Sequence, residues 1–284
     1  MPQTKQDTII GPHGNLTSAL KEWLQSDDSF AEQGKVIRRL DEEPAYRDAL
    51  LNECAQWIIE RHITELRLKK LDNERATLPE AQFRDNLAQM RLLPRNSNTQ
   101  KGNLGEIILA KYLEEVTGYT TFGIFRLTYN TNIDQSMKGD DVLLFNPTNI
   151  GKDVIYGESK VRQTPDRKAI EAIVKNLQGN KKFPVSILFY ADRLGAKGEE
   201  DLFNALDDLH LNVAKKKVPI RNVGFLLSKR DAVHDAQDTF MQVKRYLNTT
   251  NPDLVFIALG IDDVQSFVDE AYKRANILLL KGTL

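Results

Sequence analysis

The sequence predicts an α/β protein in which helices flank a mixed β-sheet and a helical region precedes the sheet. Apolar residues recur at helical spacing through most of residues 16–93, which favours helices there. Further along, helical patterns alternate with short runs of strand-forming residues, as in α/β domains. Residues 93–99 are polar and contain a proline, so they mark a border. We therefore expect a helical N-terminal region at residues 1–95 and an α/β domain at residues 96–284.

Two apolar patterns predict the N-terminal helices. Leu20, Trp23 and Leu24 would share one face of a first helix. Residues 46–71 repeat apolar side chains three and four positions apart, and the charged residues between them suit a solvent-facing side. From the position of the border alone, we expect this N-terminal region to bind a partner or to inhibit the second domain.

The second domain is predicted to alternate helices and strands. A turn-forming stretch at residues 146–149 indicates that two of the strands are antiparallel neighbours. A continuous apolar run at residues 185–190 has the length of a buried strand. The predicted helices are residues 103–116, 169–177, 202–211, 240–247 and 264–274, and the predicted strands are residues 122–128, 141–145, 153–161, 185–190, 223–227 and 254–259.

Composition argues against several classes of protein. The chain has 284 residues, 41% hydrophobic content and a net charge of −1, which are typical of a globular protein. It contains no apolar run of membrane-spanning length and no apolar signal-peptide core at its N-terminus, which together predict a cytoplasmic protein. Cys54 is the single cysteine and the four histidines are scattered, which argues against a disulfide, a thiolate zinc cluster or a histidine relay. Near-neutral charge is unusual for a protein that grips DNA unaided, so either the basic surface is local or a partner contributes.

Acidic residues and a lysine come together on two predicted neighbouring strands. Because side chains on a strand alternate between faces, Glu158 and Lys160 point the same way and Ser159 points to the other side. Asp140 and Asp141 lie at the start of the preceding strand, where one of them can meet this pair. Carboxylate oxygens suit Mg²⁺, and a cation beside them suits attack on a phosphodiester. The cluster therefore predicts metal-dependent cleavage of a phosphodiester bond.

The strand context is what gives this pattern its weight. Chance alone supplies about three acid-x-Lys matches in a chain of this composition. Asp166 and Lys168 form one such match, but they open a helical pattern and lack a strand that would order their side chains.

Three short motifs surround the cluster. They are Lys-Gly-Asn-Leu-Gly-Glu at residues 101–106, Gly-Asp-Asp at residues 139–141 and Gly-Glu-Ser-Lys at residues 157–160. With the helix and strands that carry them, they resemble the PD-(D/E)xK nuclease core of restriction endonucleases and Holliday-junction resolvases. More narrowly, they resemble the HamA-type nuclease subunit of the Hachiman antiphage defence system. The resemblance covers roughly residues 100–260 and implies a restriction-endonuclease-like core.

The resemblance implies a role for each residue of the cluster. Asp141 and Glu158 would hold Mg²⁺ or Mn²⁺ through their carboxylates, and the Ser159 carbonyl would supply a further oxygen. Lys160 would orient or deprotonate the attacking water and offset charge on the phosphate. Alternation puts only one of Asp140 and Asp141 on the catalytic side, and we favour Asp141 because it abuts the strand. The family's proline before this acid is absent, and the pair Gly139-Asp140 stands there instead.

Glu106 has two interpretations of equal weight. As the helix acid of such nucleases, it would reach the metal directly or through water. Alternatively, Asn103 caps a helix and Glu106 completes a capping box three residues later. Both hold if the cap anchors a helix of the site. Gly102 and Gly105 fit close packing at this helix, but no Gly-Lys-Ser/Thr follows them, so we expect no ATP binding in this chain.

Basic residues are concentrated just after the cluster. This local positive charge predicts phosphate contacts, although an ordinary basic helix face is the simpler alternative. Gln178, Glu106 and Asp140 are predicted to support the site, and Gln178 could contact DNA or water. The predicted DNA-binding residues are Arg162, Arg167, Lys168, Lys175, Lys181 and Lys182.

The favoured hypothesis is a Mg²⁺-dependent nuclease that cuts DNA with little sequence specificity as the effector of antiphage defence. The resemblance implies control by a HamB-type helicase subunit, which would supply ATP hydrolysis and DNA sensing. Two alternatives stay open. One is a non-catalytic DNA-binding or scaffold subunit of a helicase complex, and the other is a stand-alone repair or recombination nuclease.

Overall fold

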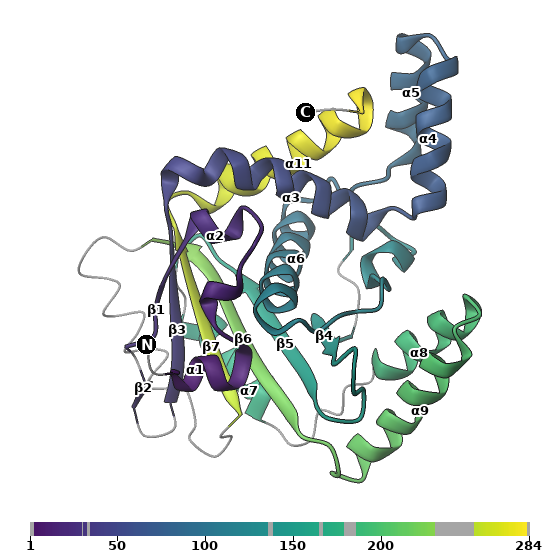
Figure 1. Cartoon of the computed structure of the whole chain (residues 1–284). Helices are drawn as coiled ribbons and strands as arrows, with labels where there is room; N and C mark the ends of the chain where they lie inside the picture. The colour runs from purple at the N-terminus through teal and green to yellow at the C-terminus, as the bar shows by residue number, and fades with distance from the viewer. Residues whose placement is uncertain are drawn as a thin grey trace.

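One β-sheet forms the centre of the protein, and helices cover both of its faces. The computed structural model describes residues 3–29, 31–32, 35–135, 139–164, 167–178, 186–230 and 253–282. Within these residues the strands form a seven-stranded sheet (Figure 1). The predicted mixed α/β architecture is therefore confirmed.

The sheet is mixed. Its strands follow the order β1-β3-β7-β6-β5-β4, and β2 pairs with β3 off this path. The four inner strands β3, β7, β6 and β5 are parallel, whereas β1, β2 and β4 each pair antiparallel with a neighbour. The strands are β1 (Leu24–Asp27), β2 (Ala31–Glu32), β3 (Lys35–Glu42), β4 (Val142–Phe145), β5 (Val154–Val161), β6 (Ile220–Lys229) and β7 (Leu254–Ile261).

The helices divide between the two faces of the sheet. The principal helices on one face are α3, α6 and α11, and those on the other are α7, α8 and α9. The described helices are α1 (Lys5–Ile10), α2 (Leu20–Trp23), α3 (Arg47–His62), α4 (Glu65–Thr77), α5 (Glu80–Met90), α6 (Ser97–Thr117), α7 (Arg167–Gln178), α8 (Ser186–Ala196), α9 (Glu200–Ala214) and α11 (Val264–Lys281). None of these described helices combines the length and apolarity needed to cross a bilayer.

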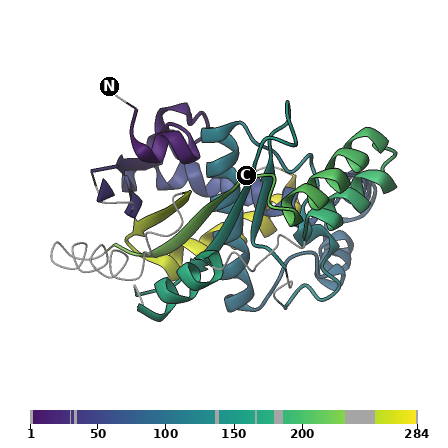
Figure 2. The same cartoon turned by 90° about the horizontal axis from the view of Figure 1, so that it is seen from below.

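Alternation along β5 shows how the sheet builds two cores. Ile155 and Val161 belong to the core under α6, whereas Val154 and Tyr156 belong to the core under α7 and α8. Because both faces of this strand are covered, its residues are almost all apolar except for Glu158, Ser159 and Lys160. Figure 2 shows α7 on one side of the sheet and the N-terminal helices on the other.

Most predicted elements of the second domain are confirmed. The predicted helix at residues 103–116 lies within α6, which begins earlier, and the predicted strands at residues 141–145 and 153–161 are β4 and β5. These two strands pair antiparallel across the short connection, as the turn signal indicated. The helices near residues 169–177, 202–211 and 264–274 and the strands near 223–227 and 254–259 are also present, as α7, α9, α11, β6 and β7.

The prediction of an all-helical N-terminal region is wrong for Leu24–Asp27, Ala31–Glu32 and Lys35–Glu42, which form β1, β2 and β3. In β3, Val36 and Leu40 enter one core and Ile37 enters the other, so the strand is buried on both faces and lacks the alternation of a half-exposed strand. Strand β3 pairs in parallel with β7, and α3 packs on α11. The first 95 residues therefore complete the sheet of the second domain, while α3, α4 and α5 bear out the helical part of the prediction.

Two further predicted strands are wrong. Residues 122–128 form a turn followed by a 3-10 helix (Arg126–Tyr129), and the positive φ angles of Phe122 (53°) and Gly123 (68°) are incompatible with a strand at these two positions. The apolar run at residues 185–190 opens α8 instead. Ile187, Tyr190 and Leu194 are buried at helical spacing, so a short apolar run here was one face of a helix. The predicted helix at residues 240–247 lies outside the described residues.

A buried arginine fastens the N-terminal segment to β3. The Arg38 side chain is 0% exposed and makes ion pairs with Asp7 and Asp28, each at 2.7 Å. Its Nη1 also donates to the Gly11 carbonyl at 3.0 Å and to the Tyr112 hydroxyl of α6 at 3.1 Å. These partners come from three segments, α1 with its C-cap, the residues after β1, and α6, so one guanidinium joins them to β3.

Replacing this arginine is expected to weaken the whole fold. Arg38→Met leaves two carboxylates facing a buried site without their cation, which should lower the free energy of unfolding by roughly 3 kcal/mol. Arg39→Met is the matched control, because Arg39 is a partly exposed residue paired with Asp41 and should cost less than about 1 kcal/mol. Urea denaturation measures both values, and equal losses in the two variants would contradict the role of Arg38.

Candidate active site

The predicted acids and lysine meet at the edge of the sheet formed by β4 and β5. Val142 pairs with Gly157, so Asp141 comes beside Glu158 on the next position of the ladder. The Asp141 Oδ2 accepts a hydrogen bond from the Ser159 backbone N–H at 2.9 Å. Lys160 Nζ lies 2.7 Å from Glu158 Oε1 and 3.8 Å from Asp141 Oδ2. The structure thus brings together Asp141, Glu158 and Lys160 on one face.

The oxygen atoms around Lys160 are of the kind that ligates a hard divalent cation. Lys160 Nζ donates to the Ser159 carbonyl oxygen at 3.0 Å as well as to Glu158 Oε1. Its ammonium therefore lies among the same three oxygen-bearing groups that were predicted to ligate a metal, those of Asp141, Glu158 and Ser159. Carboxylate and carbonyl oxygens are the ligands that Mg²⁺ prefers. The described residues hold no group of three or more His, Cys, Asp or Glu that could hold a metal ion by themselves.

Burial makes the charge on Asp141 unfavourable. Desolvation raises the pKa of the Asp141 carboxyl, and the nearby Glu158 carboxylate raises it further. Lys160, the Ser159 backbone N–H and Arg126 oppose this shift. Two acids held this close favour binding of a cation between them, because a cation relieves their mutual repulsion.

Asp140 faces away from this cluster. Its carboxylate Oδ2 accepts a hydrogen bond from the Ser186 backbone N–H at 3.0 Å, and its own backbone N–H donates to Ser186 Oγ at 3.2 Å. It thereby satisfies a backbone donor at the first residue of α8. Both acids precede β4, and Asp141 is the one whose carboxylate lies beside the Ser159 N–H and Lys160.

The glycine before these acids has a physical reason. Gly139 has a φ of 135°, a conformation that proline, with φ near −65°, does not reach. A Cβ on Gly139 would also lie 3.2 Å from Ser186 Oγ and 3.3 Å from Arg126 Cζ. Glycine at position 139 is therefore required by the turn that leads into β4.

The capping interpretation of Asn103 and Glu106 is wrong. Helix α6 begins at Ser97, and Asn96 is its N-cap, so Asn103 lies in the second turn. Asn103 is buried, and its Nδ2 lies 2.9 Å from His62 Nε2. The sequence suggested a helix start at Asn103 because asparagine is common at N-caps. In the structure, the Asn103 side-chain amide instead hydrogen-bonds the buried His62 ring.

Glu106 lies on the site side of α6. Burial raises the pKa of its carboxyl well above the ordinary value, and the Asp141 carboxylate raises it further. Arg126 and Lys160 act in the opposite direction. The structure therefore groups Glu106 electrostatically with the cluster, although it gives no hydrogen bond between Glu106 and a cluster residue.

The predicted DNA-binding residues lie on α7 and at the end of β5, where the structure describes them. Arg162, Arg167 and Lys168 are exposed, and Lys175 is exposed but paired with Glu171 at 2.6 Å. Gln178 ends α7, and its side chain lies outside the described part of the structure. Lys181 and Lys182 also lie outside the described residues.

Two residues that sequence reasoning missed contribute to the site. Asn176 of α7 donates from Nδ2 to Glu158 Oε1 at 2.8 Å. Arg126 lines a small cavity of about 40 Å³ together with Glu106 and Asp141, and it lowers the pKa of both carboxyls. Helical spacing places Asn176 three positions after Ile173 and so close to the buried face, but no sequence signal marked Arg126.

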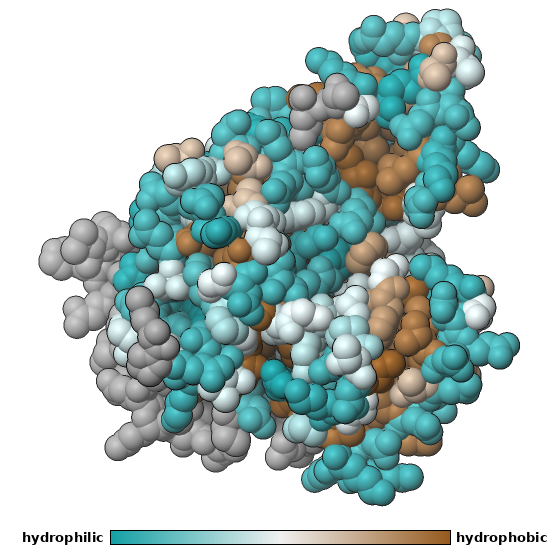
Figure 3. Space-filling model, viewed as in Figure 1, coloured by the Kyte–Doolittle hydropathy of each residue, from teal (hydrophilic) through white to brown (hydrophobic). Residues whose placement is uncertain are grey.

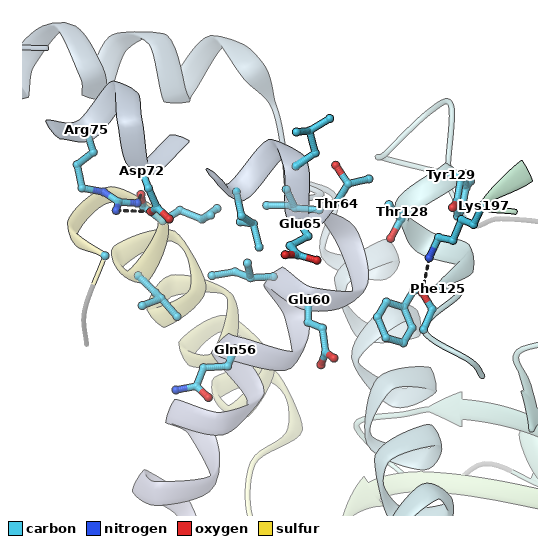
Figure 4. Close-up of a pocket in the computed structure, with 18 residues that line it drawn as sticks. Gln56, Glu60, Thr64, Glu65, Asp72, Arg75, Phe125, Thr128, Tyr129 and Lys197 are labelled. Atoms are coloured by element: carbon cyan, nitrogen blue, oxygen red, sulfur yellow. Dashed lines mark hydrogen bonds and ion pairs between the residues drawn. The ribbon is translucent and has the colours of Figure 1, made fainter. Parts of the chain in front are cut away.

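A second, larger cleft of about 840 Å³ lies away from the cluster. Figure 4 shows Glu60 and Glu65 on one wall and Phe125, Tyr129 and Lys197 on the opposite wall. Figure 3 shows apolar side chains gathered beside α4 and the end of α11, where Ile63, Leu66, Leu68, Leu278 and Leu279 line the cleft. None of the predicted site residues that the structure describes lines this cleft. The segment of residues 123–129 separates this cleft from the small cavity beside Asp141.

Comparison with known proteins identifies the family. The family model described as HamA matches residues 17–275. This chain belongs to the HamA family. The Hachiman protein HamA of Bacillus cereus is 34% identical over 280 residues, which cover 99% of this chain and 98% of that relative. The resemblance to HamA drawn from the three motifs is therefore confirmed, and it extends through the N-terminal strands and helices as well.

Gly139 offers a test of how the turn before β4 supports the site of this HamA family member. Gly139→Ala should lower the free energy of unfolding by more than about 1 kcal/mol, because the native φ is unsuited to alanine and its Cβ would crowd Ser186 and Arg126. Gly102→Ala is the control: an added Cβ meets nothing within 4 Å in α6, so it should raise stability by about 0.5–1 kcal/mol. Urea denaturation of both variants checks this, and a neutral Gly139→Ala would contradict it.

His62 predicts a dependence of stability on pH. Burial lowers the pKa of His62 to about 4, and the ring is neutral, with Nδ1 donating to the Ile58 carbonyl. Because the unfolded chain binds the proton more tightly, the contribution of His62 is complete above pH 6.5 and is lost as pH falls toward 4.

The loss from His62 should reach about 3 kcal/mol at the acidic end. His62→Gln, which does not titrate, should therefore show a shallower fall in unfolding free energy between pH 6.5 and 4. Urea denaturation across this pH range measures the slope, and identical slopes for the two proteins would refute the assignment.

Proposed function

We propose that this HamA family member is a Mg²⁺-dependent DNA nuclease with a PD-(D/E)xK-type, restriction-endonuclease-like core. The observation that carries the proposal is the meeting of Asp141, Glu158 and Lys160 on one face of the β4–β5 pair. The burial of Asp141 beside Glu158 adds support, since two neighbouring carboxylates of this kind need a cation.

Asp141, Glu158 and the Ser159 carbonyl would hold the metal. Mg²⁺, or Mn²⁺ in its place, supplies Lewis acidity toward a phosphate oxygen and makes bound water more acidic. The chain's own contribution is to fix the two carboxylates. Ser159 N–H holds one oxygen of Asp141, and Lys160 and Asn176 hold one oxygen of Glu158. Such contacts keep the ligand oxygens in place before substrate arrives.

Lys160 has two tasks in this scheme. Its ammonium balances the carboxylates in the structure, and it must move away from Glu158 when a divalent cation binds beside the carboxylates. A lysine side chain is long and flexible, so the ammonium can then turn toward the attacking water and the phosphate. There it orients the nucleophile and offsets the charge that grows on the phosphate oxygens.

Contacts to DNA are proposed to be mainly to phosphates. Arg162, Arg167 and Lys168 are exposed near the cluster, and Lys175 can exchange Glu171 for a phosphate. Such contacts position a duplex or single strand but carry little sequence information. The nuclease should therefore show little sequence specificity.

We place this activity in Hachiman antiphage defence, in the cytoplasm, because a close relative over its full length is a Hachiman protein. A helicase subunit of the HamB type is the proposed partner, and it would control a nuclease that otherwise endangers its own cell. The N-terminal region remains the proposed contact for this partner. Since β3 lies within the sheet, we assign that contact to helices α3, α4 and α5.

Cleavage of supercoiled plasmid tests the nuclease proposal. The wild-type chain in Mg²⁺ should nick or linearise the plasmid, EDTA should abolish this, and Glu158→Ala should reduce the rate at least about 100-fold. Glu171→Ala is the matched control, because Glu171 is a glutamate on α7 outside the cluster, and it should leave cleavage intact.

If the purified chain alone does not cleave the plasmid, the same assay is repeated with the helicase subunit and ATP. Cleavage there that requires Glu158 supports a partner-controlled nuclease. Partner binding without cleavage, unchanged by Glu158→Ala, would instead favour the scaffold function. Full activity in the absence of any partner would favour a stand-alone nuclease.

A further inference from the structure

Asn176 reaches the candidate site from a different layer of the fold. It belongs to α7, which packs over β5 and β6 on the face that carries Glu158. Its Nδ2 donates to Glu158 Oε1 at 2.8 Å, while Lys160 Nζ donates to the same oxygen at 2.7 Å. Both hydrogen bonds that described residues make to this carboxylate therefore end on one oxygen.

The approach of α7 depends on the residue beside Glu158 in the sheet. Glu158 on β5 pairs with Gly224 on β6. A Cβ on Gly224 would lie only 2.7 Å from Cγ2 of Ile173, so the lack of a side chain lets α7 come close. Ile173 and Asn176 are three residues apart and share a face of α7. The helix contact at Gly224 thus brings Asn176 within reach of Glu158.

Two donors on Oε1 leave Oε2 for another partner. A carboxylate held by one oxygen cannot rotate freely, so its second oxygen keeps a fixed direction. Because Asn176 is neutral, it orients Glu158 without cancelling the negative charge that a cation needs. Lys160 also holds Oε1 but carries a charge and has to move in the proposed reaction, so its hydrogen bond is temporary.

We propose that Asn176 is a positioning residue that keeps the Glu158 carboxylate oriented toward the divalent cation after Lys160 has moved away. The inference rests on the proposed nuclease function. Asn176 touches neither DNA nor cation in this scheme and acts through Glu158 alone.

Metal binding without DNA is the first test. Titration calorimetry of the full chain with Mn²⁺ should show affinity reduced about 10–100-fold in Asn176→Leu, which keeps a similar volume but cannot donate. Asn204→Leu, on an exposed position of α9, is the matched control and should bind Mn²⁺ like the wild type. Asn176→Gln keeps an amide donor and should lose less affinity than Asn176→Leu.

Plasmid cleavage separates positioning from a purely structural role. In Asn176→Leu, raising Mn²⁺ to saturation should restore kcat, and the KM for plasmid should stay unchanged because Asn176 does not contact DNA. The unfolding midpoint in EDTA should equal that of the control. A lowered midpoint, with kcat not recovered at saturating Mn²⁺, would show that Asn176 merely holds α7 and would overturn the proposal.

A double substitution tests the division of labour with Lys160. Because Lys160 has moved away in the cation-bound state, removing Asn176 should reduce Mn²⁺ affinity by a similar factor in a Lys160→Met background and in the wild type. An Asn176 effect that disappears in the Lys160→Met background would contradict the idea that Asn176 orients Glu158 without Lys160. Asn176→Ser provides the same comparison if Asn176→Leu fails to fold, because serine is too short to reach Glu158.

Glu158→Ala distinguishes failure of the inference from failure of the proposed function. If Glu158→Ala loses Mn²⁺ binding while Asn176→Leu binds like the wild type, the inference is wrong and the nuclease site stands. If Glu158→Ala binds Mn²⁺ like the wild type, the cation does not use this carboxylate, and both ideas fail together.

Discussion

The antiparallel pairing of β4 with β5 is the constraint on which the candidate site depends. Strand β4 has only four residues, and its register with β5 brings Asp141 beside Glu158. Gly157 allows β4 and α6 to pack this closely on β5, because a Cβ there would lie 2.9 Å from Leu109 of α6 and 3.0 Å from Val142 of β4. A slip of one residue would send the Glu158 and Lys160 side chains into the opposite core.

Neighbouring elements then use this pair of strands as a base. Helix α6 brings Glu106 toward Asp141 from one side, and α7 brings Asn176 to Glu158 from the other. Asp140, one residue before Asp141, instead supports the first residue of α8. The two adjacent acids therefore have different roles. Asp140 hydrogen-bonds the start of α8, and Asp141 belongs to the charged cluster.

The electrostatics of the cluster balance an unfavourable grouping of acids. Burial raises the pKa values of Asp141 and Glu106; the Glu158 carboxylate raises the pKa of Asp141 further, and the Asp141 and Glu158 carboxylates raise that of Glu106. Lys160 and Arg126 offset this repulsion from two directions. An arrangement that stores unfavourable carboxylate contacts near a cation position is costly for folding but suits cation binding. The same logic does not apply to Arg38, whose buried charge is matched by Asp7 and Asp28 and serves the fold.

The sequence by itself determined the α/β class, most elements after residue 96 and the shared face of Glu158 and Lys160, because these follow from local periodicity and strand alternation. It also determined membership of the HamA family, through motifs that lie in short contiguous segments. Only the tertiary structure decided that β1, β2 and β3 are strands, that residues 186–196 form a helix and that Asn103 lies inside α6. Each of these depends on contacts with distant parts of the chain. Strand β3 pairs with β7, the start of α8 at Ser186 bonds to Asp140, and Asn103 bonds to His62. The parts that Asn176 and Arg126 play were hidden for the same reason, since contacts between separate elements leave no local pattern in the sequence.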